Sequence, residues 1–379
     1  MNDERLMILK MLKDGKISEE EAIKLLDALD KKNTSNNENI NKSKDRNWDE
    51  NFEKKINKLG DKLEKKFENF SEKFNKIGEE ISDNAYSLSD RIVDAVDSIL
   101  DKEDLNFLFG NYNIKTEEFE VELSDITEPI LDFKTINGKV SINPWSKDYI
   151  YIKATSYIKK NKISTEENIM SLDKYQNKIS LKPLLTSNIG IKLEVSIPDI
   201  HYKKINIMTS NGKVNFYDLK SQNVSIETSN ASINLEGVDI SNILDLSTKN
   251  GKIYLHNITS NFLKANTKNG SIHIKSSKIK DVLCNTTNGK INVENIDTSK
   301  LNEIKLNTTN ASISILLDNV DIGYNIDATT TNSSIDINLP DLVYDNDKDK
   351  EIKAHRKNYE SNKNINFSLY TTNRGIYIK

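Results

Sequence analysis

The chain repeats one phrase at 209–216 (TSNGKVNF), 228–235 (TSNASINL), 248–255 (TKNGKIYL), 267–274 (TKNGSIHI) and 286–293 (TTNGKINV). Related copies begin at Thr135, Thr308, Thr330 and Thr371. From Asn211 to Asn332 the asparagines of the phrase recur at intervals of 19 to 22 residues. Self-similarity at such a period is typical of a solenoid, and it predicts a mainly β, single-chain parallel β-solenoid (β-helix) with about 19–22 residues per rung.

Asn-Gly between apolar runs is also the usual signal for a β-hairpin, so an antiparallel meander is the first alternative. A type I′ turn needs positive φ at both central residues. The second of these is Ala231, Ala311 or Ser333 in three copies. The phrase therefore favours a corner between stacked rungs.

Apolar residues occupy fixed places around each asparagine. The third and fifth positions after it are apolar in every rung from Val214/Phe216 to Ile335/Ile337. Alternate residues before it, such as Val224, Ile226 and Thr228, are also candidates for the interior. A third apolar position falls eight residues after the asparagine, at Leu219, Val238, Ile258 and Ile296, with Ser277 as the exception. Three short sides per rung predict a roughly triangular coil.

Parallel rungs about 4.8 Å apart would bring like residues together as ladders. Asparagine amides can donate to and accept from one another between rungs, so we interpret these residues as structural, with a ligand groove as the alternative. The expected structural ladder consists of Thr209, Asn211, Thr228, Asn230, Thr248, Asn250, Thr267, Asn269, Thr286, Asn288, Thr308, Asn310, Thr330 and Asn332.

The repeat divides the second half of the chain. We expect the solenoid over 203–379, with a charged loop at 345–364 and a closing rung formed by the C-terminal segment INFSLYTTNRGIYIK. Residues 105–202 have longer apolar runs and one copy of the phrase, which predicts an amino-terminal β region and cap. Such caps protect the open ends of a solenoid.

The first hundred residues have helical patterns. Residues 1–30 predict a helical hairpin interaction module, in which Asp14-Gly15 ends the first helix and Ser18 with Glu21 forms a capping box for the second. Residues 31–48 are polar and predict a flexible linker. Residues 49–104 predict a long amphipathic helix, whose apolar stripe follows the straight-helix period rather than the 3.5-residue repeat of a coiled coil and so suits packing on a flat surface or in a bundle.

These helices need a partner surface. Self-association through 1–30 and 49–104, or packing within the chain, is favoured over contact with a membrane surface. The segment from Asp49 to Glu80 has eight lysines and nine acidic residues, and so lacks the basic excess that anionic lipids attract.

Net charge, cysteine count and the lack of a long apolar run at the amino terminus limit the kinds of function that the sequence supports. The formal charge of −4 comes from 54 basic and 58 acidic residues, which does not support nucleic-acid binding. The single cysteine, Cys284, precludes an internal disulfide. Residues 1–29 have no apolar run of the length of a signal peptide or membrane span, so the sequence predicts a cytoplasmic protein.

Candidate catalytic, cofactor and metal-binding residues are not found. The four histidines are scattered without metal-ligand spacing; they are His201, His256, His273 and His355. Cys284 lies two residues before Thr286, on the side of its strand that is expected to face inward, and is interpreted as a buried core thiol. No phosphate loop or nucleophile elbow is present. The chain is therefore predicted not to be an enzyme, although side chains of neighbouring rungs could converge as in a carbohydrate-active β-helix enzyme.

Two segments carry a family resemblance. The hairpin ERLMILKMLKDGKISEEEAIKLLDAL resembles the short helical amino-terminal domain of bacterial YvlB/LiaX-type proteins, and the Thr-x-Asn-Gly-x-Ile-x-Ile rungs resemble the "putative adhesin" β-strand-repeat family. The resemblance implies a β-solenoid without known enzymatic activity, linked in low-GC Gram-positive bacteria to envelope stress responses and in some members to the cell surface.

The leading functional hypothesis is a non-catalytic, cell-envelope-associated binding or scaffold protein, whose solenoid surface contacts a protein or envelope component. The alternative is a cytosolic regulatory adaptor that acts through the helical hairpin. A carbohydrate-active β-helix enzyme is the third hypothesis.

Overall fold

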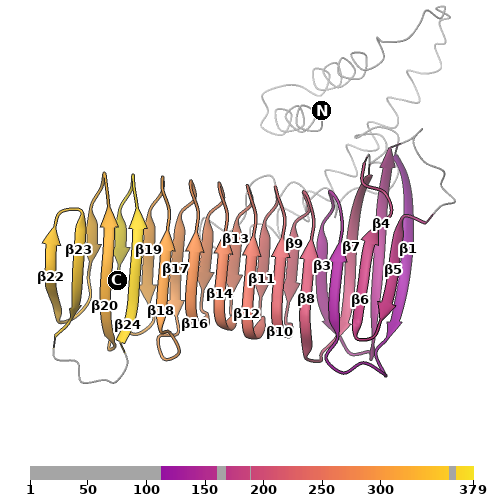
Figure 1. Cartoon of the computed structure of the whole chain (residues 1–379), viewed down its shortest axis with the longest axis horizontal. Helices are drawn as coiled ribbons and strands as arrows, with labels where there is room; N and C mark the ends of the chain where they lie inside the picture. Colours follow the sequence, from indigo (N-terminus) through magenta and orange to yellow (C-terminus); the bar gives the residue numbers. More distant parts are fainter. Residues whose placement is uncertain (1–111, 160–167, 188, 358–363) are drawn as a thin grey trace, which may run out of the picture. The chain divides into compact units, whose positions relative to one another are not determined.

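The computed structural model describes residues 112–159, 168–187, 189–357 and 364–379. The predicted hairpin (1–30), linker (31–48) and long helix (49–104) lie outside the described residues. The described residues form two facing β-sheets that run along a common axis (Figure 1).

One sheet, called sheet A, has 12 strands. Their spatial order is β1 (Tyr112–Glu122), β4 (Tyr149–Lys159), β7 (Ile189–Pro198), β3 (Val140–Trp145), β9 (Val214–Tyr217), β11 (Ile233–Glu236), β13 (Ile253–His256), β15 (Ile272–Lys275), β17 (Ile291–Ile296), β19 (Ile313–Leu317), β25 (Ile376–Ile378) and β21 (Ile335–Ile337).

The other sheet, called sheet B, has 13 strands. Their spatial order is β22 (Leu342–Lys348), β23 (Glu351–Arg356), β20 (Gly323–Thr330), β24 (Asn364–Thr371), β18 (Glu303–Asn307), β16 (Lys278–Asn285), β14 (Thr259–Asn266), β12 (Asp239–Ser247), β10 (Lys220–Glu227), β8 (Tyr202–Met208), β2 (Ile130–Lys134), β6 (Lys178–Pro183) and β5 (Met170–Tyr175).

Each repeat of the phrase contributes one strand to each sheet. A strand of sheet B leads through the Thr-x-Asn corner into a short strand of sheet A, and a second corner leads to the next strand of sheet B. Consecutive rungs pair in parallel with equivalent residues in register, as Ile233 with Ile253 and Leu244 with Leu263. The rungs therefore stack as the β-solenoid that the repeat predicts.

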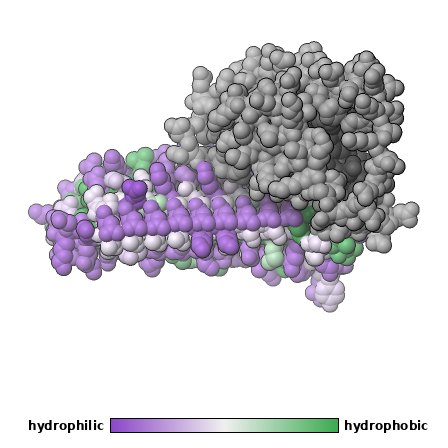
Figure 2. Space-filling view, turned by 90° about the horizontal axis from the view of Figure 1, so that it is seen from above, coloured by the Kyte–Doolittle hydropathy of each residue, from purple (hydrophilic) through white to green (hydrophobic). Residues whose placement is uncertain are grey.

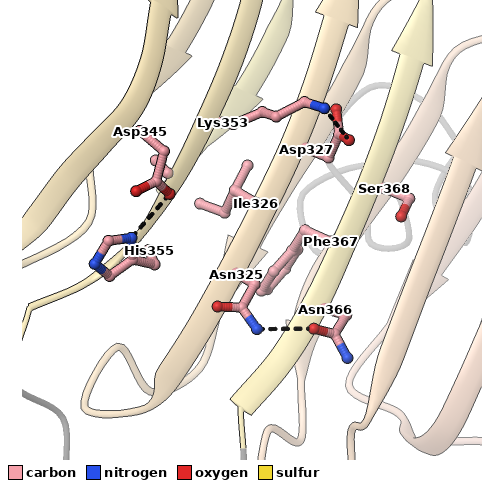
Figure 3. Close-up of a pocket in the computed structure, with 10 residues that line it drawn as sticks. Asn325, Ile326, Asp327, Asp345, Lys353, His355, Asn366, Phe367 and Ser368 are labelled. Atoms are coloured by element: carbon pink, nitrogen blue, oxygen red, sulfur yellow. Dashed lines mark hydrogen bonds and ion pairs between the residues drawn. The ribbon is translucent and has the colours of Figure 1, made fainter.

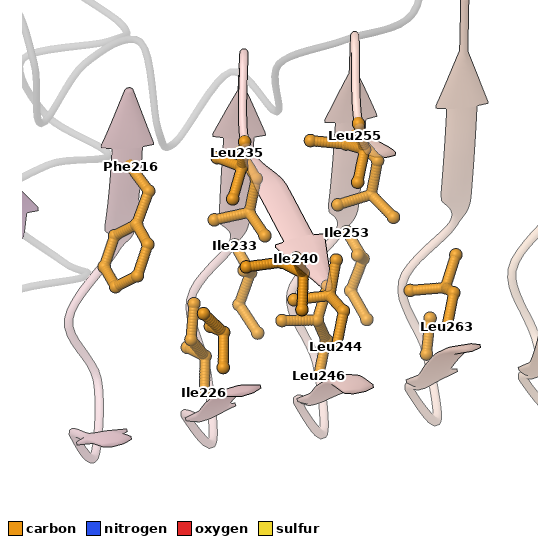
Figure 4. Close-up of a cluster of buried hydrophobic side chains, with 14 of the residues drawn as sticks. Phe216, Ile226, Ile233, Leu235, Ile240, Leu244, Leu246, Ile253, Leu255 and Leu263 are labelled. Carbon is orange, nitrogen blue, oxygen red and sulfur yellow. The ribbon is translucent and has the colours of Figure 1, made fainter. Parts of the chain in front are cut away.

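The core lies between the sheets, because alternation along each strand directs every second side chain inward. Figure 4 shows Phe216, Leu235 and Leu255 of sheet A facing Leu246 and Leu263 of sheet B, and all five are fully buried. The interior positions predicted after each asparagine are confirmed, although Ile335 and Ile337 in β21 are only partly buried.

The predicted triangular cross-section is wrong, because each rung has two strands and not three. The third apolar position does not form a side of its own. Leu219, Val238 and Ile258 are buried at the second corner, one residue before the strand of sheet B begins. These apolar side chains fill the end of the core between the two sheets and separate it from solvent.

The C-terminal rung does not close the stack. β24 pairs with β18 on one side and β20 on the other, and β25 lies between β19 and β21 in the same way. Because β24 and β25 have the same phrase as their neighbours, they satisfy parallel pairing on both sides, and sequence order does not decide their place.

Within the charged loop expected at 345–364, residues 345–348 and 351–356 are strand, and 358–363 lie outside the described residues. β22 and β23 pair antiparallel beyond β20 and cover that edge of sheet B. The reason is an alternating pattern in β23, where Ile352 and Ala354 are buried while Lys353 faces solvent. Charged residues on a short edge hairpin also discourage pairing with another chain.

Antiparallel strands stand at the other end of the stack. β1 pairs with β4 and β4 with β7 at the start of sheet A, and β5 pairs with β6 at the start of sheet B. In sheet B, antiparallel strands therefore flank the parallel rungs at both ends. In sheet A they flank the parallel rungs only at the end that contains β1.

Candidate binding surface

Nine asparagines form a continuous row along the corner that follows the strands of sheet B, which we call the amide edge. Except in Asn137, each side-chain Nδ2 donates to Oδ1 of the asparagine in the neighbouring rung, and the seven N···O distances from Asn230 onward are 2.5–2.7 Å. Asn211 donates to Asn137 in the same way. The spatial order is Asn137, Asn211, Asn230, Asn250, Asn269, Asn288, Asn310, Asn373 and Asn332.

The amide edge faces solvent. Figure 2 looks onto this edge and shows a continuous hydrophilic row along the stack. A primary amide has two N–H groups and two acceptor lone pairs on its oxygen. Each interior asparagine of the row uses one N–H group and one lone pair in its bonds to the two neighbouring asparagines. Every interior rung therefore offers solvent one further donor and one further acceptor, at a spacing of about 4.8 Å.

The threonines of the phrase lie just inside the amide edge and are buried. They do not bond to one another. Each hydroxyl donates to a backbone carbonyl of the neighbouring rung, as Thr267 to Gly251 and Thr308 to Gly289, both at 3.0 Å. The Oγ1 of Thr209 is the exception, since it is buried without a hydrogen-bond partner.

The glycines of the phrase serve close backbone approach rather than a left-handed turn. A Cβ on Gly270 would lie 1.7 Å from the carbonyl oxygen of Gly251, and one on Gly289 would lie 1.7 Å from that of Gly270. Gly237 is the one glycine with positive φ among the described residues, and it lies at the other corner. The hairpin alternative for Asn-Gly is therefore wrong.

Left-handed residues occur at the second corner, seven residues after the asparagine. Asp218, Gly237, Asn257, Ser276 and Asn295 have φ between 45° and 67°. Asparagine, aspartate and glycine tolerate this conformation best. The sequence interpretation missed this corner because the residue type changes from rung to rung, although small polar residues at a fixed spacing were a usable signal.

The predicted ladder residues lie on one edge, in a slightly different order. The structure places Asn211 to Asn310 in consecutive rungs, but Asn373 separates Asn310 from Asn332. Asn137 and Asn373 also belong to the row, although the ladder set omitted them. Thr330 likewise contacts the inserted rung, donating to the carbonyl of Arg374 at 2.9 Å.

A shallow depression of about 250 Å³ lies on the outer face of sheet B over β20, β23 and β24 (Figure 3). Its polar groups are paired: His355 Nδ1 lies 2.9 Å from Asp345, and Lys353 Nζ lies 3.5 Å from Asp327. Ser368 lines the side away from His355 in Figure 3, so it does not form a nucleophile and base pair with that histidine.

The remaining titratable candidates are structural. Cys284 is fully buried in β16, and burial raises the pKa of its thiol, so it is held as a neutral thiol in the core. Burial, together with the nearby cation Lys252, lowers the pKa of His273. His256 Nδ1 lies 3.4 Å from Oε1 of Glu236 on the outer face of sheet A.

Within the described part of the chain, no group of three or more His, Cys, Asp or Glu side chains is arranged to hold a metal ion. No helix there is long and apolar enough to cross a membrane.

Two solved structures align with most of this chain at low identity. A "putative cell adhesion protein" from Clostridium sporogenes is 12% identical with a TM-score of 0.27, and the alignment covers 70% of this chain and 99% of that one. A "putative adhesin" from Parabacteroides merdae is 11% identical with a TM-score of 0.35, covering 71% and 98%. No curated protein has a matching sequence.

Two family models match the chain. Residues 3–34 match a SHOCT-like domain. Residues 131–368, which include eight of the nine asparagines of the amide edge and most of both sheets, match the model described as Toastrack DUF4097. The match spans more than half of the 379 residues, and the chain therefore belongs to the Toastrack DUF4097 family.

Proposed function

We propose that this protein is a non-catalytic binding or scaffold protein that presents a rigid, regularly spaced polar surface to a component of the cell envelope. The amide edge carries the proposal, because its nine asparagines expose the same groups rung after rung. Solenoids use such extended surfaces to bind partners that are themselves extended.

The distribution of reactive groups supports binding over catalysis. Cys284 is buried, and the His355–Asp345 and Lys353–Asp327 pairs are exposed to solvent on an open face. Catalytic sites concentrate perturbed groups in a cleft from which water is excluded. A regular row of neutral amides instead offers recognition by hydrogen bonds.

The envelope role is tested by localisation. Cells are fractionated and each fraction is probed with a specific antibody, with and without envelope-active antibiotics. We expect a substantial share of the protein in the envelope fraction, and a rise after antibiotic treatment if the protein takes part in an envelope stress response. A pool found wholly in the soluble fraction under both conditions would contradict the envelope role.

A second candidate, a cytosolic regulatory adaptor, is favoured by the SHOCT-like match at residues 3–34. In this role the amino-terminal segment captures a signalling partner, and residues 1–30 and 49–104 allow self-association. Deletion of residues 1–30 should then abolish capture of the partner in a cross-linking experiment and leave the circular dichroism of the β-sheets unchanged. Unchanged capture would contradict the adaptor role.

A further inference from the structure

The amide edge carries a one-sided charge. Its six consecutive corners at 210–213, 229–232, 249–252, 268–271, 287–290 and 309–312 have five lysines and no acidic residue, a formal charge of +5. Of these lysines, Lys249, Lys268 and Lys290 are exposed and Lys252 is half-buried, whereas Lys213 is buried at 6% exposure. Arg374 adds a further exposed cation in the inserted rung.

The opposite edge of the same six rungs has the other sign. Its corners at 217–220, 236–239, 256–259, 275–278, 294–297 and 316–319 have three lysines and six acidic residues, a formal charge of −3. The acidic residues are Asp218, Glu236, Asp239, Glu294, Asp297 and Asp318. The whole chain has a formal charge of −4, so the positive edge is a local feature that net charge conceals.

The cations of the two edges also differ in pairing. On the opposite edge Lys220 lies 3.0 Å from Asp199, and Lys278 lies 3.4 Å from Asp297. On the amide edge Lys249, Lys268 and Lys290 are exposed, and no ion pair joins them to a carboxylate of the described residues. Unpaired charges in a row produce a field that attracts an anion of matching shape.

Resting on the proposed binding function, we infer that the amide edge binds a linear polymer of phosphate-linked polyols laid along the solenoid axis. The lysine ammonium groups face the phosphates, and the free N–H and lone pair of each asparagine bond to the polyol hydroxyls. Lysine has a flexible stem, so its charge can follow phosphates whose spacing differs from that of the rungs.

The same edge is poorly suited to nucleic acid. Proteins that bind single strands combine cations with aromatic side chains on which bases stack. None of the six corners of the amide edge contains an aromatic residue. Hydroxyl groups, by contrast, match the donor and acceptor that every rung presents.

The test is a titration of fluorescently labelled synthetic poly(glycerol phosphate) with the full-length protein, followed by anisotropy at several salt concentrations. Wild-type protein should bind, and its affinity should fall linearly with the logarithm of salt concentration, because polymer binding releases counterions. Absence of binding at low salt overturns the inference. Tighter binding of an oligothymidylate of equal charge overturns it in favour of nucleic acid.

The decisive variant replaces Lys249, Lys252, Lys268 and Lys290 by glutamine. Its matched control makes the same change at Lys220, Lys264, Lys278 and Lys305, which are exposed on other surfaces and paired to carboxylates. The edge variant should bind poly(glycerol phosphate) about tenfold or more weakly, and the control within about twofold of wild type. Equal losses would assign the binding to net charge and overturn the inference. Thermal unfolding of both variants verifies the fold.

Envelope retention separates this inference from the proposed function. If wild-type protein sediments with isolated envelopes but does not bind the polymer in the titration, the binding function stands and the polymer inference falls. If wild-type protein does not sediment with envelopes, the proposed function falls, while the titration alone decides whether the edge binds the polymer.

Discussion

The side-chain Nδ2 of Asn373 donates to Oδ1 of Asn310 at 2.6 Å, across 63 residues of sequence. On its other side, Asn332 donates to Asn373 at 2.7 Å. The C-terminal segment therefore forms an internal rung of the stack. Its core side chains should stabilise the fold as those of a central rung do.

Ile376 and Ile335 test this placement, since they are paired neighbours of the same type in β25 and β21. Ile376 is fully buried, whereas Ile335 in the last rung of sheet A is only partly buried. Ile376→Ala should lower the free energy of unfolding by about 2–5 kcal/mol, and Ile335→Ala by roughly half as much. Urea denaturation measures both, and equal losses would contradict the internal position of the C-terminal rung.

The amide edge should contribute to stability as well as to recognition. Asn269→Ala removes the bonds to Asn250 and Asn288. Because the edge is exposed to water, each bond contributes modestly, and a total loss of about 1–2 kcal/mol is expected in urea denaturation. Asn242, which is exposed in β12 outside the row, is the matched control, and its replacement by alanine should cost less than about 0.5 kcal/mol.

Gly270 tests the close approach of backbones at the corner. A Cβ there would lie 1.7 Å from the carbonyl oxygen of Gly251, so Gly270→Ala should force neighbouring rungs apart and destabilise the protein by about 1–3 kcal/mol. Ala311→Gly at the equivalent corner should change stability by about 1 kcal/mol or less. The melting temperature should fall further for Gly270→Ala than for Ala311→Gly, and similar values for the two variants would contradict steric crowding.

Ser277 departs from the apolar repeat, yet it is well accommodated. Its Oγ accepts from the backbone N–H of Ile258 at 3.1 Å and donates to the carbonyl of Lys275 at 2.8 Å. Ser277→Val restores the apolar pattern but leaves the Ile258 N–H without its acceptor, so we expect a loss of about 1–3 kcal/mol. If the valine variant unfolds at higher urea concentration than wild type, apolar burial outweighs the hydrogen bond.

Cys284 predicts a dependence of stability on alkaline pH. Burial raises the pKa of its thiol, so the folded state keeps the proton to higher pH than the unfolded state does. The stabilisation is complete below the unfolded pKa of about 8.5 and is lost as pH rises above it, by up to about 1.4 kcal/mol per pH unit. Urea denaturation between pH 8 and 10 should show a steeper decline for wild type than for Cys284→Ala. Parallel declines would contradict this role of the thiol.

The sequence predicted the parts of the fold that depend on a regular local pattern. Alternating Ile-x-Ile after each asparagine placed Ile253 and Leu255 in the core, and the fixed interval placed Asn250 beside Asn230 and Asn269. Both follow from the two-residue periodicity of a strand and the identity of successive rungs.

The parts that the sequence did not predict depend on competition between similar segments or on residue types that vary. β24 and β25 pair as well with β18 and β19 as any sequential rung would, so the phrase could not locate them. The positive φ at Asp218 and Ser276 has no single residue signature. The charge of the amide edge appears only when residues from six rungs are placed along one line.

The asparagines of the edge all donate in the same sense, each toward the rung nearer Asn137. At one end the Nδ2 of Asn137 donates to the carbonyl of Ile189, and at the other the Oδ1 of Asn332 accepts no bond from the described residues. The row therefore has a polarity, as a helix has. A linear polymer bound along the row in one direction and the same polymer bound in the opposite direction would form different complexes. The two orientations should therefore differ in affinity.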